Sequence, residues 1–508
     1  MYEVTTAGSD EPRQLSWAQL DVAVARAAAA LLRLGVAPGD AVAYQLPNRL
    51  EFVTISLATL RIGAVCEPLM PIFREHELRS MLHQSAARVL IVPDEFRGHD
   101  YGAMAQALRA ELDELEHVIV LGDENPLQHA DPEDPAAIAA RRPTPDSTAQ
   151  LLFTSGSTGE PKGVLHPHRT LSAAASAHVH HFGLGDDDVI YIPSPLAHQT
   201  GFLYGMWIAL LLGVPQVLQE SWDANLGFDA IERTGVTFVQ AATPFLADLV
   251  RVARERQRPP TRLRTFVATG AAIPRELARR ARTVLQAEVG GAWGSTESCL
   301  GAAFAPGDPP ELAWSADGRA LQGVRLRIVD DLGHELPAGA EGNFEVLTSC
   351  MFEGYLNHPE LTAEALSADG WYRTGDLARI DADGYLRITG RVKDVINRGG
   401  EKVPAAEIEQ LLYEHPAVRE VAIVAMPDPR LGERACAFVV LQPDGELDFA
   451  AVQEYLDSER VSKTYWPERL ELVESMPRTA SGKIQKFLLR QRAAELAATP
   501  LARGKADS

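Results

Sequence analysis

The chain has 508 residues, of which 46% are hydrophobic and 23% are charged, a composition typical of a globular protein. This length exceeds what one hydrophobic core usually organises, so we expect at least two domains. The formal net charge of −21 at pH 7 repels nucleic acid and anionic membrane surfaces. An anionic ligand therefore needs a local binding site, and no nucleic-acid partner is expected.

The four cysteines and the apolar segments indicate in which cellular compartment the protein is expected. Cys66, Cys299, Cys350 and Cys436 lie far apart and show neither CxxC nor Cys/His metal-ligand spacing, which is typical of reduced thiols. The most apolar stretch, residues 201–218, is interrupted by glycines and a proline. It predicts a buried helix and a following strand, not a membrane span. The N-terminal residues show no signal-peptide pattern, so a cytoplasmic location is expected.

Apolar periodicity predicts alternating helices and strands in the first half of the chain. Helical patterns cover residues 17–34, where Ser16 can cap the N-terminus, and residues 49–63. Strand patterns occur at residues 40–48, 88–94, 117–122 and 236–244. This alternation predicts an α/β fold with parallel sheets covered by helices, in which ligands bind at the carboxyl ends of strands. Residues 123–150 are polar and rich in Pro and Asp, and predict a surface connection.

The pattern changes near residue 370. Residues 381–403 contain the turn residues and short alternating runs of a charged hairpin. A helical pattern and two strand patterns follow, at residues 405–416, 418–428 and 435–445. They predict a second, smaller α+β unit. We place the boundary near Arg391, so that residues 1–391 form a large domain and residues 392–508 a small one.

Residues 151–166, LLFTSGSTGEPKGVLH, run from an apolar strand pattern into a polar loop. Glycines let a backbone approach a ligand, hydroxyls donate hydrogen bonds, and Lys162 supplies positive charge. The spacing fits neither the GxxxxGK[ST] loop nor GxGxxG. The stretch predicts a site for phosphate oxygens.

Three further motifs follow in order: WGSTES at residues 293–298, YRTGDLARIDADGYLRITGRVKDVINRGGEKVPAAEIE at 372–409, and PRTASGKIQK at 477–486. Together with TSGSTGEPKG they resemble the motifs of adenylate-forming ligases, which include acyl-CoA synthetases, carrier-loading aryl-acid ligases and luciferases. The resemblance implies a large N-terminal domain with helix-covered sheets and a small, mobile α+β C-terminal domain. It also implies ATP-dependent conversion of a carboxylic acid to an acyl-AMP, release of pyrophosphate, and transfer to the thiol of CoA.

The resemblance also implies roles for individual residues. The β- and γ-phosphates would be cradled by Thr154, Ser155, Gly156, Ser157, Thr158, Gly159 and Lys162. Thr296 would bind the α-phosphate, and Glu297 would bind Mg²⁺, a hard cation that prefers oxygen ligands. Trp293 stands where tyrosine is more usual and would line the adenine slot. Asp376 would accept hydrogen bonds from both ribose hydroxyls, and Arg391 would contact ribose or phosphate.

Both half-reactions would use the small domain. Lys483 would neutralise the carboxylate and the α-phosphate as they approach each other. After pyrophosphate leaves, the domain would rotate at the hinge residue Lys393. Gly399 and Gly400 would then line a tunnel for the pantetheine arm of CoA.

The acyl pocket is expected within residues 194–205, 241–245 and 268–273. Its candidate residues are His198, Gln199, Phe202, Gly270 and Ala271. Because the substrate carboxylate is already ionised at neutral pH, we interpret His198 as a pocket wall, not as a general base. Ligases for dihydroxybenzoate usually carry asparagine at the position of Gln199, which argues against that substrate. The amino-acid sequences of these segments most resemble those of cyclohexanecarboxylate and medium-chain acyl-CoA ligases. The resemblance implies an alicyclic, medium-chain or other bulky apolar acid as substrate.

Several alternatives stay open. The thiol is that of free CoA or the phosphopantetheine of a carrier protein, because INRGGEKV is also similar to aryl-acid ligases that load a carrier protein. The chain could be specialised for one half-reaction, be a luciferase relative that uses oxygen, or bind acyl-adenylates without making them. The expected ligands are ATP, Mg²⁺, CoA and a small-molecule carboxylic acid, and a homodimer is possible.

Overall fold

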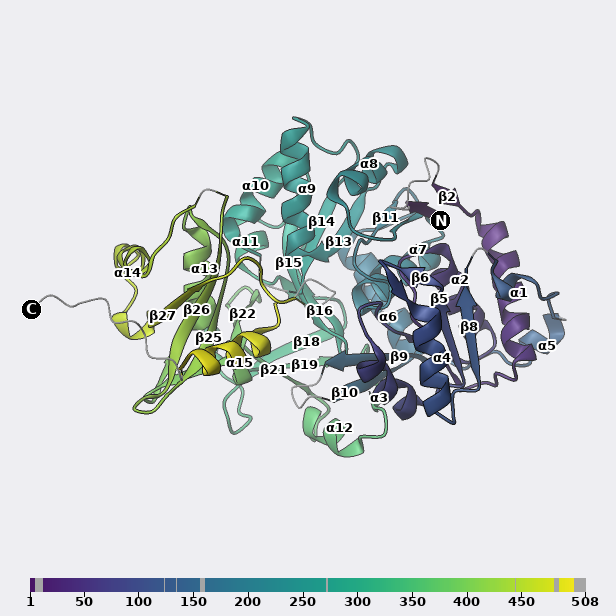
Figure 1. Cartoon of the computed structure of the whole chain (residues 1–508). Coiled ribbons are helices and arrows are strands. Elements are labelled where there is room, and N and C mark those ends of the chain that lie inside the picture. The colour runs from purple at the N-terminus through teal and green to yellow at the C-terminus, as the bar shows by residue number, and fades with distance from the viewer. Residues whose placement is uncertain are drawn as a thin grey trace, which may run out of the picture.

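A computed structural model describes residues 1–4, 12–122, 124–133, 135–155, 160–270, 273–443, 445–478 and 484–497. Three large sheets and one two-stranded sheet belong to the N-terminal part of the described chain, and a further sheet belongs to the C-terminal part (Figure 1). The seven-stranded sheet has the order β20-β10-β9-β4-β3-β5-β8, with bounds Gly354–Tyr355, Pro161–Pro167, Thr148–Ser155, Val65–Pro68, Ala41–Tyr44, Val89–Pro93 and His117–Leu121.

The nine-stranded sheet has the order β17-β16-β15-β14-β13-β11-β12-β1-β2, with bounds Arg319–Ala320, Cys299–Ala303, Glu288–Ser295, Thr265–Thr269, Phe238–Ala242, Ile190–Tyr191, Gln216–Gln219, Tyr2–Val4 and Arg13–Gln14. A four-stranded antiparallel sheet follows the order β18-β19-β21-β22, with bounds Val324–Val329, Gly342–Thr348, Tyr372–Ile380 and Leu386–Arg391. A short hairpin joins β6 (Glu95–Phe96) to β7 (His99–Asp100).

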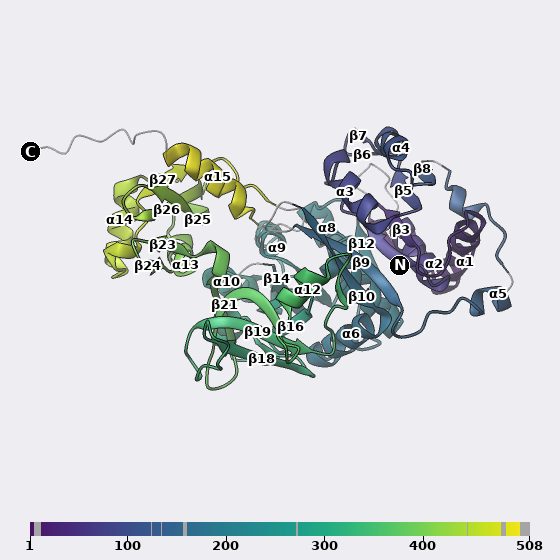
Figure 2. The same ribbon diagram turned by 90° about the horizontal axis from the view of Figure 1, so that it is seen from below.

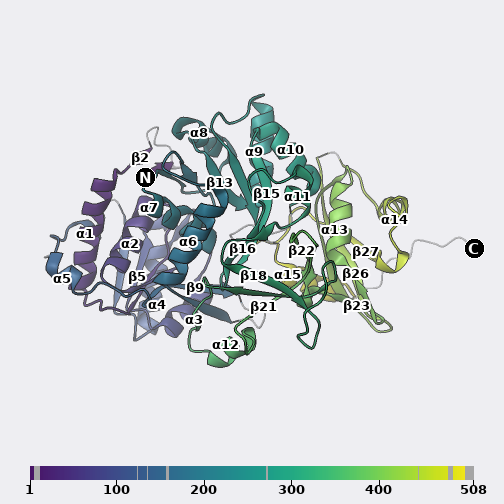
Figure 3. The same cartoon turned by 180° about the vertical axis from the view of Figure 1, so that it is seen from behind.

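Helices cover the sheets of the N-terminal part. They are α1 (Trp17–Arg33), α2 (Leu50–Arg61), α3 (Glu75–Ser85), α4 (Tyr101–Glu111), α5 (Pro135–Ala139), α6 (His168–Phe182), α7 (Ile208–Leu212), α8 (Ala224–Thr234), α9 (Thr243–Glu255), α10 (Arg275–Leu285), α11 (Pro310–Ser315) and α12 (Pro359–Ala365). Helix α6 contacts β9 and β10 on one side and β16 on the other, and lies between the two large sheets (Figure 3). Their facing side chains merge in one large apolar core.

The predicted alternation of strands and helices is confirmed, with differences at the edges of the sheets. Ser16 caps α1 with a capping box, because its side chain accepts from the backbone of Gln19 and the Gln19 side chain accepts in return. Strands β3, β4, β5 and β8 pair in parallel, as do β11 to β15. Strand β10 instead runs antiparallel to β9, because the connection between them is too short for the crossover that a parallel pair needs.

The apolar stretch at residues 201–218 forms a buried π-helix (Thr200–Trp207), helix α7 and most of strand β12. This confirms the predicted helix and strand. Among the described helices, none combines the length and apolarity needed to cross a membrane. The four cysteines are buried and unpaired. Burial raises the pKa of Cys66 and Cys436 to about 12, and that of Cys299 further still, so these thiols are poor nucleophiles.

The C-terminal unit has its own core. Its sheet follows the order β24-β23-β26-β25 with β27 beside β26, with bounds Glu401–Val403, Ile396–Arg398, Gly432–Leu441, Val418–Asp428 and Arg469–Leu472. Helices α13 (Ala405–Glu414) and α14 (Phe449–Ser458) pack with one face of this sheet, and α15 (Lys486–Ala497) packs on the other. Figures 1 and 2 show this unit at one end of the molecule, beside β21 and β22. The predicted boundary near Arg391 stays a prediction.

A small cavity of about 60 Å³ lies where the two parts meet. Ile273, Trp314 and Ile388 line it from the N-terminal side, and Glu407 and Gln410 of α13 line it from the other. Asp317, also in its lining, is half-buried and accepts a hydrogen bond of 2.8 Å from the Ile388 amide. Burial raises the pKa of Asp317 to about 6. Helix α13 therefore rests on the segment that immediately precedes Arg391.

Candidate active site

The predicted phosphate loop joins β9 to β10. Thr154 and Lys162 are paired across this hairpin, and Thr154 Oγ1 donates to the Lys162 carbonyl at 3.4 Å. Ser155 ends β9. The other predicted loop residues, Gly156, Ser157, Thr158 and Gly159, lie outside the described residues. The hairpin therefore brings the first part of the motif and its lysine to one end of the seven-stranded sheet.

Tyr355 of β20 connects Lys162 to Glu297. The Lys162 ammonium lies over the Tyr355 ring, 5.3 Å from its centroid, and the Tyr355 hydroxyl donates a hydrogen bond of 2.9 Å to Glu297 Oε1. Burial and the nearby Glu297 carboxylate raise the pKa of Tyr355, so the hydroxyl keeps the proton that it donates. Two candidate residues that are 135 positions apart in sequence thus contact one side chain.

The turn that carries Thr296 and Glu297 is fixed by its backbone. His166 Nε2 lies 2.7 Å from the Thr296 carbonyl, and the Phe352 amide donates to the Glu297 carbonyl at 2.8 Å. Burial lowers the pKa of His166 to about 4. Since the imidazole is then neutral at pH 7, Nε2 carries its hydrogen and donates to Thr296. The strand that leaves the predicted phosphate loop therefore holds the turn of Thr296 and Glu297 in place.

The residues around this turn fit Mg²⁺ carried by a nucleotide. The described residues contain no group of three or more His, Cys, Asp or Glu side chains arranged to hold a metal ion. Mg²⁺ commonly binds one or two carboxylates and completes its coordination with substrate phosphates and water. The Glu297 carboxylate, partly exposed beside the hairpin of Lys162, suits that mode of binding.

Asp376 receives a hydrogen bond on each carboxylate oxygen. Trp293 Nε1 donates to Oδ2 at 2.9 Å, and Arg391 Nε donates to Oδ1 at 2.7 Å. The carboxylate is only 6% exposed. The Trp293 ring also packs edge-on against Phe344, with centroids 4.7 Å apart. The predicted adenine, ribose and phosphate residues thus form one connected group, and each Asp376 oxygen keeps acceptor capacity for a ribose hydroxyl.

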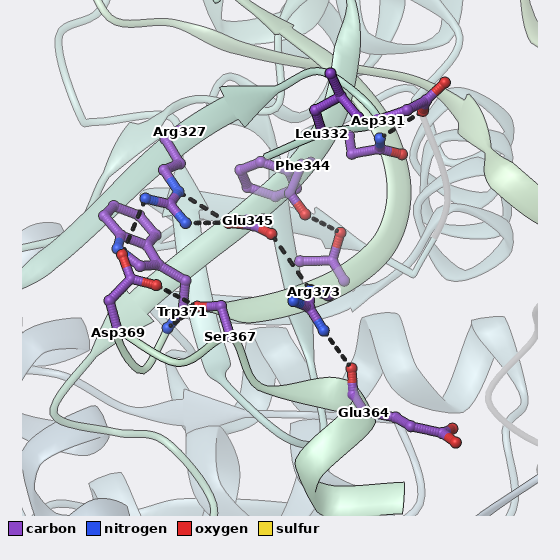
Figure 4. Close-up of polar contacts among 12 residues, drawn as sticks. Arg327, Asp331, Leu332, Phe344, Glu345, Glu364, Ser367, Asp369, Trp371 and Arg373 are labelled. Carbon is purple, nitrogen blue, oxygen red and sulfur yellow. Dashed lines mark hydrogen bonds and ion pairs between the residues drawn. The ribbon is translucent and has the colours of Figure 1, made fainter. Parts of the chain in front are cut away.

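A network of polar contacts anchors the strand that carries Asp376 (Figure 4). Glu345 of β19 pairs with Arg327 of β18 at 2.6 Å and lies 3.8 Å from Arg373 of β21. The Arg327 guanidinium stacks 4.2 Å from the Trp371 ring centroid. Nearer the site, Thr374 Oγ1 donates to the Phe344 carbonyl and accepts from the Asp376 amide. These contacts fix the register of β21 against β19 and with it the position of Asp376.

Three of the predicted acyl-pocket residues, His198, Gln199 and Phe202, lie at or within the π-helix. Gln199 is 4% exposed, and its Nε2 lies 3.7 Å from the Sγ of Cys299, two residues beyond Glu297. Phe202 is fully buried and lies against Trp207. His198 Nδ1 accepts from the Thr200 amide at 3.2 Å. The structure therefore brings Gln199 close to the turn that carries Thr296 and Glu297.

The remaining predicted residues are less connected to this group. Gly270 lies exposed just beyond β14 with a φ of +84°, and Ala271 lies outside the described residues. Lys393 is in a short 3₁₀ turn (Val392–Asp394), where burial and the nearby Arg391 lower its pKa. Gly399 and Gly400 are exposed at the tip of the β23–β24 hairpin. Lys483 lies outside the described residues.

Two family models match the chain: AMP-binding enzyme over residues 2–356, and AMP-binding enzyme C-terminal domain over residues 407–483. The chain belongs to the AMP-binding enzyme family. This confirms the resemblance to adenylate-forming ligases, together with the α/β fold that has a large N-terminal and a small C-terminal domain.

Relatives of this AMP-binding enzyme act on several classes of acid. It is 38% identical over 485 residues to a medium-chain fatty-acid–CoA ligase of Escherichia coli. The alignment covers 94% of this chain and 85% of that protein. It is 37% identical over 482 residues to a salicyl-AMP ligase / salicyl-S-ArCP synthetase of Mycobacterium tuberculosis, with 93% and 84% covered. Among solved structures, an anthranilate CoA ligase in complex with anthranoyl-AMP has a TM-score of 0.87 at 26% identity, with 98% and 94% covered.

The sequence did not single out Tyr355, His166, Phe344 or Thr374. His166 ends the stretch 151–166 that contains the phosphate-loop motif. Its position on a strand next to apolar residues could have indicated that its side chain is buried near the site. Tyr355 follows Gly354 in a short segment without periodicity. Its role depends on the pairing of β20 with β10, which the local sequence does not contain.

Proposed function

We propose that this AMP-binding enzyme joins a carboxylic acid to ATP to form an acyl-AMP and pyrophosphate, and then transfers the acyl group to the thiol of CoA. The observation that carries the proposal concerns strand β15. Trp293 on this strand binds Asp376, and Thr296 and Glu297 follow at its end, beside Tyr355. One strand thus connects a ribose-type acceptor with the phosphate and metal groups.

In the first half-reaction an oxygen of the carboxylate attacks the α-phosphorus, and the bond from that phosphorus to the bridging oxygen of pyrophosphate breaks. Two anions must approach each other, so the barrier depends on positioning and on charge neutralisation. Lys162 and the loop hydroxyls hold the departing phosphates. Thr296 binds the α-phosphate, and Asp376 and Arg391 orient the ribose.

Charge neutralisation has two sources in this proposal. Glu297 would hold Mg²⁺, which when bound would supply positive charge to the phosphate oxygens. Lys483 supplies the second cation, between the carboxylate and the α-phosphate. A lysine suits this position because its ammonium is a compact charge on a flexible stem.

In the second half-reaction the thiol sulfur attacks the acyl carbon, the carbon–oxygen bond to AMP breaks, and the thiol proton is lost. Lys483 then obstructs the path of the thiol. We infer that residues 392–508 rotate as a domain about Lys393 and bring Gly399 and Gly400 to the large domain. The exposed position of these glycines is consistent with a hairpin that is free to move.

The acid is proposed to be alicyclic, medium-chain or otherwise bulky and apolar. The buried Phe202 and the apolar residues near it support this class, as does the similarity to the medium-chain ligase. Free CoA is the proposed acceptor. A carrier-protein phosphopantetheine is the second candidate, because the salicyl-AMP ligase / salicyl-S-ArCP synthetase is a relative of nearly equal identity.

The test is an incubation of the enzyme with ATP, Mg²⁺, CoA and a panel of aliphatic, alicyclic, aromatic and polycyclic acids. Mass spectrometry should find AMP and acyl-CoA in equal amounts, with the highest yield for an apolar alicyclic or medium-chain acid. Formation of ADP in place of AMP would exclude the mechanism. Acylation of a carrier protein without acylation of CoA would favour the second candidate.

A further inference from the structure

Tyr355 holds a cation and an anion with two different parts of one side chain. Strand β20 pairs with β10, and Tyr355 lies opposite Val164. Lys162 precedes Val164 by two residues, so its side chain points to the same face of the sheet as that of Val164. The Lys162 ammonium contacts the face of the Tyr355 ring, whereas Glu297 Oε1 accepts from the hydroxyl at 2.9 Å.

A direct ion pair between Lys162 and Glu297 would compete with the binding of a nucleotide and its cation. Lys162 and Glu297 carry opposite charges, and both side chains extend to Tyr355. Without a group between them, their attraction would favour a direct ion pair. A direct ion pair would occupy both the phosphate-binding ammonium and the metal-binding carboxylate. Among the described residues, however, neither Lys162 nor Glu297 takes part in an ion pair, and each contacts Tyr355 instead.

The Tyr355 ring is itself held in place. Phe352 packs edge-on against it, with centroids 4.9 Å apart, and also contacts the Tyr372 ring at 6.0 Å. The Phe352 amide donates to the Glu297 carbonyl, and the Tyr355 amide donates to Thr362 Oγ1 at 2.9 Å. Ring and carboxylate are therefore fixed relative to each other by one short segment of chain.

We propose that Tyr355 is a positioning residue that keeps Lys162 and Glu297 apart, so that both stay available to the phosphates and the cation of a bound nucleotide. The ring attracts the ammonium by a cation–π contact, and the hydroxyl satisfies one carboxylate oxygen. This role rests on the proposed function, because it gives Lys162 and Glu297 their ligands.

The test measures the dissociation constant of MgATP by calorimetry, with the full-length wild type and its variants. Tyr355→Phe keeps the ring and removes the hydroxyl. It should weaken MgATP binding about fivefold at low salt, the size of a partly exposed ion pair. Because salt screens such a pair, the difference from wild type should shrink at high ionic strength. On a Glu297→Gln background, Tyr355→Phe should have no further effect.

Tyr385→Phe is the matched control, because it removes a tyrosine hydrogen bond of the same length, 2.9 Å, to Asp308, which is not among the candidate site residues. It should leave MgATP binding unchanged. A wild-type dissociation constant in Tyr355→Phe, or an equal loss on the Glu297→Gln background, would overturn the proposal. A lower melting temperature of Tyr355→Phe with unchanged binding would also overturn it, since the role would be structural. If wild type itself binds no MgATP, the proposed function fails first.

Discussion

Trp293 Nε1 and Asp376 Oδ2 are joined by a hydrogen bond of 2.9 Å between residues 83 positions apart. The bond links strand β15 of the nine-stranded sheet to strand β21 of the four-stranded sheet. Arg391 donates to the other oxygen of the same carboxylate. The two sheets and the last residue of strand β22 therefore meet at the residue proposed to hold the ribose.

Trp293→Phe should impair ATP binding by releasing Asp376. The phenyl ring keeps an aromatic contact with Phe344 but has no donor for the carboxylate. Loss of a hydrogen bond to a charged group costs about 1.5 kcal/mol, so the KM for ATP should rise about tenfold. Discrimination between ATP and 3′-deoxy-ATP should also decrease. Phe344→Leu is the control, since it alters the ring contact and leaves the donor; a similar loss of discrimination there would argue against the orienting role of Trp293.

Lys483→Ala should separate the two half-reactions. Removal of a cation from between two anions should slow adenylation by about 10²-fold or more. Transfer from a supplied acyl-AMP to CoA should continue, because Lys483 has no part in that step. The control is Lys486→Ala, which removes a nearby lysine that pairs with Glu409 at 2.6 Å. Wild-type pyrophosphate exchange by Lys483→Ala would refute the assignment.

Lys393→Pro should restrict rotation of the small domain. Proline fixes φ near −65°, which suits the 3₁₀ turn observed here, and limits the preceding residue. We expect adenylation within about threefold of wild type and thioester formation reduced by about 10²-fold, because only the second step needs the rotation. Lys393→Ala, which removes the charge without restricting φ, should support both steps. Equal loss of both half-reactions in the proline variant would contradict a hinge at this position.

Glu67→Gln should stabilise the protein, and more so as the pH rises. Glu67 of β4 is fully buried, and burial raises its pKa to about 8 from an ordinary value of 4.5. Above pH 4.5 this carboxyl is ionised in the unfolded chain but stays protonated in the folded chain. The free energy of unfolding of the wild type is therefore undiminished by Glu67 below pH 4.5 and decreases as the pH rises toward 8. The loss is about 1.4 kcal/mol per pH unit.

Urea denaturation at pH 5.5, 6.5 and 7.5 measures this effect. The stability advantage of Glu67→Gln over wild type should grow at each step. Glu116→Gln alters an exposed carboxylate that pairs with Arg88 and has a lowered pKa. It should show no such trend, because that carboxylate is ionised in both states over this range. A constant difference for Glu67→Gln would mean that Glu67 is ionised in the folded protein.

Local sequence patterns predicted the elements and the motifs well. Ser16 and the alanines and leucines after it specify helix α1, and the periodic runs specify β3, β5, β8 and β13. The phosphate-loop motif predicted an anion site, which stays a prediction; the structure places Thr154 and Lys162 opposite each other in a hairpin. The predictions of helices and strands succeed because capping and periodicity act over a few residues.

Long-range contacts were beyond the local patterns. Nothing near Trp293 indicates that its indole reaches Asp376, and nothing near Tyr355 indicates that its hydroxyl reaches Glu297. Both contacts depend on how separate strands are placed by the packed core. His166 illustrates the same point, because its neutral state follows from burial beneath the Thr296 turn. The proposed approach of Gly399 and Gly400 to the large domain stays a prediction, since it requires a second arrangement of the two domains.

Adenylation of a carboxylic acid is measured by carboxylate-dependent exchange of labelled pyrophosphate into ATP in the absence of CoA. We expect exchange with an apolar alicyclic or medium-chain acid, dependence on Mg²⁺, and loss of exchange in Glu297→Gln. Absence of exchange across aliphatic, alicyclic, aromatic and polycyclic acids, while a supplied acyl-AMP still acylates CoA, would contradict the proposed adenylation.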